Sequence, residues 1–249
     1  MGITRFHICL LTLLFVIFPQ RCAYAESNDF STFPARLLSD VNATFSRSDN
    51  AAALLLMGGA SVTLHNTDAD RNLNDNFNSH RAFNDTSDKV FDLAGNPVIH
   101  LGATGIWYLS ADESNQQRAL TMLSALAITD SVTFGLKAIV NTERPNGDDF
   151  SFPSAHTASS FCVASVLDEF YGPQVGIPAY IGAALVGWRM MDSGDHWASD
   201  VLFGGTLGFV VGHSVAAKHK AIEIAGFKVE PIVSVGVNPA TGIGLVKRF

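Results

Sequence analysis

The chain has 249 residues, of which 47% are hydrophobic and only 16% are charged. This length provides for one sizeable hydrophobic core, carried by a single domain with or without added segments. The formal net charge of −7 argues against a protein that holds nucleic acid or anionic lipid by charge alone. Clustered lysines and arginines in such an acidic chain therefore need a local explanation.

Residues 1–25 have the pattern of a secretory signal peptide. Arg5 precedes an apolar stretch from Phe6 to Phe18, and Ala23-Tyr24-Ala25 has the small-x-small form of a cleavage site. An uncleaved anchor helix is the alternative, but the apolar stretch is short for a membrane span. We expect an exported protein, in the bacterial periplasm, either soluble or membrane-associated. Cleavage would leave Cys162 as the sole cysteine, so no internal disulfide is expected.

Helical patterns dominate the chain after the signal. A short helix is expected around residues 34–45 and a longer one over 51–64, whereas 65–88 is rich in Asn, Asp and Ser and is predicted to be a loop. Its alternating acids resemble a calcium loop, but Leu73 stands where that loop needs glycine. Five further segments, rich in small and apolar residues, have helix length: 96–109, 116–140, 154–170, 175–191 and 200–217.

These patterns predict an all-α fold, a compact bundle of about six core helices with a short C-terminal β-hairpin. The hairpin is expected from β-branched runs at 228–237 and 243–249 around a turn. Because charged residues such as Asp130 interrupt the apolar segments, burial of the helices against one another is favoured over a set of membrane spans. The expected domains are 1–25 signal peptide, 26–88 N-terminal helical and loop region, 89–220 core, and 221–249 hairpin tail.

Three short blocks in the second half carry the chemistry. In the first, Lys137 and Arg144 lie seven residues apart, and Pro145 biases Arg144 out of helical geometry. An arginine fork can hold two phosphate oxygens, and a lysine supplies a point charge. Taken alone, the block fits an ordinary cationic helix end equally well.

The second block, Pro153-Ser154-Ala155-His156, opens an apolar segment and so predicts a helix N-terminus. Backbone N–H groups at such a terminus bind anions, and Ser154 and the Ala155 amide could donate to a phosphate oxygen. His156 stands one step further, where it could give a proton to a departing oxygen. The simpler reading is that Ser154 only caps the helix.

The third block contains Arg189, His196 and Asp200. His196 and Asp200 are four residues apart, so on a helix they share a face. A carboxylate on one imidazole nitrogen fixes the tautomer and leaves the other nitrogen as a nucleophile. Arg189 is a third cation in an apolar setting, where an isolated charge is costly unless it has a partner or a ligand.

Together the blocks resemble the phosphatidic acid phosphatase type 2 superfamily, over roughly residues 90–217. Lys137-x6-Arg144-Pro145 matches the family pattern in full, as does His196-x3-Asp200. Three positions depart from it: Ala155 replaces glycine, Trp188 replaces serine, and six residues rather than five separate Arg189 from His196.

The resemblance implies a phosphatase that needs no metal or other cofactor. It implies that His196 attacks phosphorus and forms a phosphohistidine, that Asp200 orients His196, and that His156 protonates the leaving oxygen and then activates water. The phosphate-binding residues implied are Lys137, Arg144, Ser154, Ala155 and Arg189. A bell-shaped pH profile is expected, with one histidine neutral and one protonated.

The substrate is expected to be a phosphate monoester, with lipid phosphates and pyrophosphates among the candidates and nucleic acid excluded. Two other functions stay open at this point. One is a non-catalytic helical protein that binds a lipid or anion, suggested by the extra residue before His196 and by Trp188. The other is vanadate-dependent halide oxidation, for which the chain is short.

Overall fold

The computed structural model describes residues 30–220 and three strands in the range 222–246. The expected signal peptide, residues 1–25, lies outside the described residues. After a 3₁₀ turn at Phe30–Thr32, the described part of the chain contains nine α-helices and three β-strands. They are α1 Phe33–Phe45, α2 Ser48–His65, α3 Asp68–Ser79, α4 Asp85–Gly95, α5 Pro97–Ser110, α6 Glu113–Val140, α7 Ala155–Tyr171, α8 Pro173–Asp192, α9 Ala198–His219, β1 Ile222–Ile224, β2 Phe227–Ser234 and β3 Ala240–Val246.

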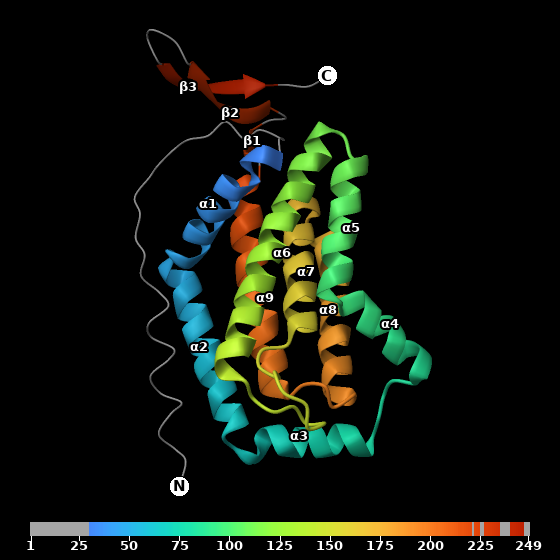
Figure 1. Cartoon of the computed structure of the whole chain (residues 1–249). Coiled ribbons are helices and arrows are strands. Elements are labelled where there is room, and N and C mark those ends of the chain that lie inside the picture. Colours follow the sequence, from blue (N-terminus) through green and yellow to red (C-terminus); the bar gives the residue numbers. More distant parts are fainter. Residues whose placement is uncertain (1–29, 221, 225–226, 235–239, 247–249) are drawn as a thin grey trace.

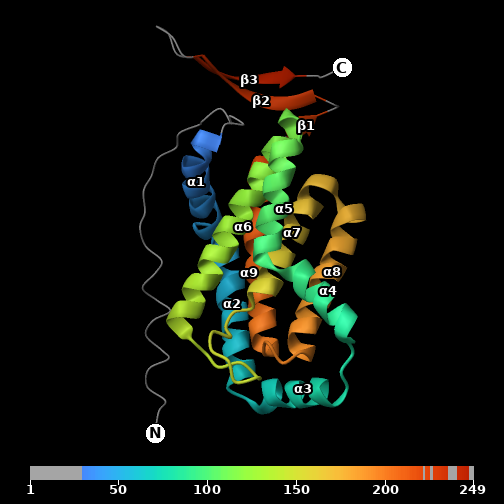
Figure 2. The same ribbon diagram turned by 45° about the vertical axis from the view of Figure 1, so that its right-hand side comes forward.

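The long helices run side by side, and the two ends of this bundle differ (Figure 1). At one end, α3 lies across the bundle beneath the loops that join α6 to α7 and α8 to α9 (Figures 1 and 2). Helix α4 then connects α3 to α5. At the other end, the strands form an antiparallel sheet in the order β1-β2-β3. All three sequence blocks therefore lie at the α3 end.

The predicted fold is wrong in its helix count and in its tail. Nine helices, rather than about six, make up the described part of the chain, and a three-stranded sheet replaces the two-stranded hairpin. The 65–88 segment, predicted to be a loop, contains α3 and the start of α4. Local caps explain this difference, because Thr67 accepts from the Ala69 amide and Asn84 from the amides of Thr86 and Ser87. Those polar residues begin helices rather than loops.

Helices α7 and α9 approach each other closely because glycines of α9 face the backbone of α7. A Cβ at Gly208 would collide with the Ala158 carbonyl oxygen, and one at Gly212 would lie 2.6 Å from the Cys162 carbonyl oxygen. Gly208 and Gly212 lie four positions apart on α9, and Ala158 and Cys162 lie four positions apart on α7. One face of α9 therefore packs directly on the backbone of α7. Helix α7 begins in the second sequence block and α9 just after His196, so this packing brings the two blocks together.

A buried carboxylate ties the far end of the bundle together. Asp40 of α1 is fully buried, and its Oδ1 accepts from Lys218 Nζ and lies 2.7 Å from His219 Nε2. Its other oxygen accepts from Ser124 Oγ. These contacts join α1, α6 and α9 and lower the pKa of Asp40 despite its burial, which would raise it.

The outer faces of the bundle carry many large apolar side chains. Two helices, α6 and α9, are long and apolar enough to cross a membrane by length and composition, although most of each such stretch is buried inside the structure. Large apolar side chains are also exposed on shorter helices at the surface. On α2, α5 and α8 they are Leu55, Leu56, Val62, Val98, Ile99, Ile106, Leu109, Val175, Ile177, Ile181 and Trp188. Surfaces of this kind mark sites that contact lipid or other apolar partners.

Candidate active site

A cavity of about 590 Å³ opens at the α3 end of the bundle. This volume is in the range of small-ligand sites. Residues from all three sequence blocks line it, together with apolar side chains of α5 and α6. The lining residues are Asn96, Pro97, Val98, Leu101, Asp130, Phe134, Lys137, Ala138, Arg144, Phe150, Ala155, His156 and His196. Two cations and two histidines that are far apart in sequence therefore share one cavity.

His196 lies in the loop between α8 and α9, four residues before Asp200 in the first turn of α9. Its Nδ1 lies 3.4 Å from Asp200 Oδ2, and both side chains are buried. The same Asp200 oxygen accepts from the Trp197 amide at 2.9 Å and from Ser151 Oγ at 2.5 Å. Three donors from two loops thus hold this carboxylate in place beside the imidazole, which favours the tautomer with a proton on Nδ1.

Burial lowers the pKa of His196, and the charges of Lys137 and Arg144 lower it further, whereas the hydrogen bond and charge of Asp200 raise it. The net direction is downward, so the imidazole is neutral at pH 7. A neutral imidazole whose Nδ1 is held by a carboxylate offers its Nε2 lone pair. This is the state that a histidine nucleophile requires.

The two cations come from the end of α6 and from the loop that follows. Lys137 is buried, and its Nζ donates to the carbonyl oxygens of Phe150 and Ser151 at 2.6 and 2.8 Å. These bonds fold the loop back over α6. Arg144 lies within that loop, and its Nε is buried without a hydrogen-bond partner among the described residues. An unpartnered guanidinium N–H at a cavity wall can donate to an anion.

His156 occupies the first turn of α7. Its Nε2 lies 3.4 Å from Asp92 Oδ1 of α4, too loosely aligned to count as a hydrogen bond. Burial lowers the pKa of His156 to about 4, against the opposing effect of Asp92. Both imidazoles are therefore neutral at pH 7 before substrate binds, and the expectation of one neutral and one protonated histidine stays a prediction for the reacting site. A phosphate anion in the cavity would raise the pKa of His156.

Ser154 and Ala155 form the helix N-terminus beside the cavity. The Ser154 side chain is completely buried, and its Oγ lies 3.0 Å from Thr157 Oγ1 and accepts from the Thr157 amide. Ser154 thus caps α7, whereas Ala155 lines the cavity. Oriented N–H groups at this terminus supply partial positive charge to the cavity wall.

Arg189 does not line the cavity in this structure. Its guanidinium forms a two-point contact with Asp88, with Nε and Nη2 donating at 2.8 and 2.9 Å. Its Nη1 donates to Asp92 at 3.0 Å and to Asp195 at 2.7 Å. Arg189 therefore anchors α4 and the loop before His196. That it also binds phosphate stays a prediction.

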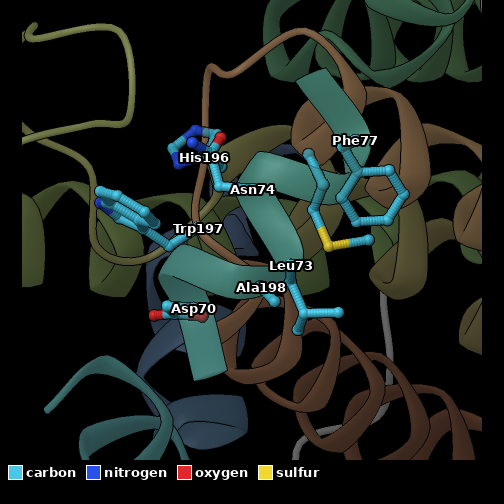
Figure 3. A pocket seen from close by; sticks show the side chains of 8 residues that line it. Asp70, Leu73, Asn74, Phe77, His196, Trp197 and Ala198 are labelled. Carbon is cyan, nitrogen blue, oxygen red and sulfur yellow. The ribbon is translucent and has the colours of Figure 1, made fainter. Parts of the chain in front are cut away.

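Helix α3 supports the His196 loop from below. Figure 3 shows Asp70, Leu73 and Asn74 on one helix, facing the chain segment that carries His196 and Trp197. The depression between the two segments leaves no space for a water molecule. Asp70 is buried and accepts from both the amide and the hydroxyl of Ser199. It thereby fixes the start of α9 and, with it, the position of the loop.

Sequence reasoning missed several residues of this site. Ser151 supports Asp200, and Asp70 fixes the start of α9, while Asp88 and Asp92 bring α4 to the cavity edge. Their signal is weak, because Asp70 and Asp88 lie in the 65–88 segment that is predicted to be a loop, Asp92 lies just after that segment, and Ser151 lies between two blocks. The spacing of Asp88 and Asp92, one helical turn apart, is the pattern that could have placed both on one helix face.

Comparison with known proteins gives one family and a small set of relatives. A model of the PAP2 superfamily matches residues 118–222. A lipid A 1-phosphatase of Porphyromonas gingivalis is 28% identical over 165 residues, which cover 64% of this chain and 36% of that protein. The chain thus matches only about a third of that relative's length.

Two solved structures are similar. Aquifex aeolicus LpxE gives a TM-score of 0.50 at 21% identity, with 59% of this chain and 93% of that chain covered. A transmembrane PAP2 type phosphatidylglycerolphosphate phosphatase of Bacillus subtilis gives a TM-score of 0.53 at 21% identity, with 68% and 94% covered. At this identity the likeness shows a shared fold.

Proposed function

We propose that this chain, whose residues 118–222 carry a PAP2 superfamily domain, is a phosphatase that hydrolyses lipid phosphate monoesters through a phosphohistidine on His196. One observation carries the proposal: His196, which is paired with the buried Asp200, lines the same cavity as Lys137, Arg144 and His156. These groups supply a nucleophile, two fixed cations and a proton-transfer group around one space. Phosphoryl transfer depends mainly on such positioning and on neutralised oxygen charge.

In the first step, the Nε2 lone pair of His196 attacks phosphorus and the bond from phosphorus to the ester oxygen breaks. His156, protonated once the phosphate anion has raised its pKa, gives its proton to the departing oxygen, which leaves as an alcohol. Lys137, Arg144 and the N-terminus of α7 hold the nonbridging oxygens. Asp200 stabilises the positive charge that develops on His196.

In the second step, the now neutral His156 takes a proton from a water molecule. The resulting hydroxide attacks phosphorus, the phosphorus–nitrogen bond breaks, and inorganic phosphate leaves with His196 restored. One histidine thus serves as acid and then as base, which closes the catalytic cycle without net proton change on the protein.

A lipid substrate is supported by two independent observations. The bundle exposes large apolar side chains on α2, α5 and α8, as expected of a protein in contact with a bilayer. The curated relative is named a lipid A 1-phosphatase, and one structural neighbour is a transmembrane phosphatidylglycerolphosphate phosphatase. We infer that the chain works at a membrane after export, with the cavity at the membrane–water interface.

The test is phosphate release from phosphatidic acid, phosphatidylglycerophosphate, isoprenyl pyrophosphate and an aryl phosphate, with membrane and soluble fractions assayed separately. His196→Ala is expected to abolish release, and vanadate to inhibit the wild type. His213→Ala is the matched control, because His213 is exposed on α9, pairs with Glu169 and does not line the cavity. Full activity in His196→Ala would end the proposal.

A further inference from the structure

One buried carboxyl group in the cavity wall takes no part in the proposed reaction. Asp130 of α6 lines the cavity and is only 6% exposed. Its Oδ1 accepts a hydrogen bond from Ser159 Oγ of α7. Its Oδ2 is buried and has no hydrogen-bond partner among the described residues. The hydrogen bond to Ser159 links α6 to α7 and gives Oδ1 a partner, but it leaves Oδ2 without one among the described residues.

The position of Asp130 relative to the phosphate-binding end is set by the helix. Asp130 precedes Lys137 by seven residues, which is two turns, so both side chains lie on one face of α6 about 10 Å apart along its axis. The cavity wall near Asp130 is otherwise apolar, with Val98 and Leu101 of α5 and Phe134 of α6. The cavity thus extends from a cationic end to an apolar end that contains one carboxyl.

Carboxyl oxygens that are buried in apolar surroundings are normally hydrogen-bonded, because desolvation without a partner is costly. A purely hydrocarbon ligand would leave Asp130 Oδ2 unpartnered, whereas a ligand with a hydroxyl or amide N–H at that depth would supply the missing donor. Sites built to pair with a polar group of a ligand discriminate strongly against analogues that lack it.

We propose that Asp130 is a specificity-determining residue that accepts a hydrogen bond from a hydroxyl or amide group in the body of the substrate, two helical turns (about 10 Å) along α6 from Lys137 at the cationic end of the cavity. This inference rests on the proposed function. It narrows the substrate class to phosphorylated lipids with a hydrogen-bond donor beyond the phosphate ester. Lipid phosphates whose body is hydrocarbon alone are then the poorer substrates.

The test uses a series of ω-hydroxyalkyl phosphates of increasing length, each compared with the plain alkyl phosphate of equal length. The wild type is expected to favour the hydroxylated member by about tenfold in kcat/KM, mainly through KM, and only near the length that spans about 10 Å. Asp130→Leu is expected to reduce this ratio to about one. Asp130→Asn, which keeps an acceptor, is expected to retain part of it and covers the case in which the leucine variant fails to fold.

Asp75→Asn is the matched control, since Asp75 is exposed on α3 and does not line the cavity. It is expected to keep the wild-type ratio. A wild-type ratio near one at every length, or a preference that survives in both Asp130 variants, would overturn the inference.

Binding separates this inference from the proposed function. The corresponding ω-hydroxyalkyl and alkyl phosphonates are titrated into His196→Ala by calorimetry, with and without the Asp130→Asn change. A length-dependent preference that Asp130→Asn weakens supports the role of Asp130 even if the wild type hydrolyses none of the phosphates. Equal binding of both series refutes that role, even if the wild type proves to be an active phosphatase.

Discussion

Replacing Arg189 by methionine decides whether this residue is an anchor of α4 or a ligand of the substrate. The Arg189 side chain is only 9% exposed and donates to three carboxylates, those of Asp88, Asp92 and Asp195. Removing one member of a buried ion-pair network costs about 3–5 kcal/mol. The three carboxylates are between a quarter and a half exposed, and water can take over part of their solvation, so we expect about 2–3 kcal/mol here.

For a chain of this size, each kcal/mol shifts the midpoint of thermal unfolding by about 2–4 °C. Arg189→Met should therefore lower Tm by about 4–12 °C in the absence of ligand. The rise in Tm on adding vanadate should persist, because Lys137, Arg144 and the α7 N-terminus still bind the anion. Thermal unfolding in detergent, with and without vanadate, measures both quantities.

Arg81→Met is the matched control. Arg81 is 55% exposed and lies 3.8 Å from Asp192. Its loss should therefore lower the free energy of unfolding by no more than about 1 kcal/mol, which corresponds to a fall in Tm of about 2–4 °C. An Arg189→Met protein with wild-type Tm and no response to vanadate would refute the anchoring role. It would favour the phosphate-binding role that the sequence pattern predicted.

Four further predictions concern the site and the fold. Asp200→Asn should lower kcat by about 100-fold or more in steady-state assays, because the amide can bond to the wrong tautomer of His196. Since burial lowers the pKa of both histidines and the proposed reaction needs His156 protonated and His196 neutral, kcat/KM should rise as pH falls from 7 and decline again only below the lower of the two pKa values, which a pH–rate profile measures. Vanadate binding near pH 7 should take up a proton on His156, whose unliganded pKa is about 4, and calorimetry in buffers of different ionisation enthalpy would detect it. Asp40→Asn should destabilise the fold by about 3–5 kcal/mol without changing kcat, because Asp40 lies at the far end of the bundle; an altered kcat with an unchanged Tm would contradict this.

The cations and histidines that line the cavity could be selected from sequence because they fall in short blocks. Each block carries its own local geometry: Pro145 keeps Arg144 out of helical geometry, Ser154 begins a helix, and His196 precedes Asp200 by four residues. What joins the blocks is the glycine face of α9 against α7, which follows from helix packing that no single block encodes. The shared cavity was therefore a hypothesis from sequence and becomes visible only in the fold.

The supporting residues could not be predicted in the same way. Asp88 and Asp92 matter because α4 packs beside Arg189, 97 or more residues later in the chain. Asp70 matters because α3 crosses beneath α9. Such contacts depend on tertiary structure, and the acidic composition of 65–88 pointed to a loop because Asp and Asn favour helix caps and turns over helix interiors.

Chemical trapping of the intermediate tests the central claim most directly. Wild-type protein is mixed with a ³²P-labelled lipid phosphate and quenched in alkali, which preserves phosphohistidine, and the labelled peptide is identified by mass spectrometry. The account predicts phosphate on His196, with none in His196→Ala and more in His156→Ala supplied with an activated aryl phosphate. Sustained turnover with label on another residue, or with none on the protein at any time, would contradict it.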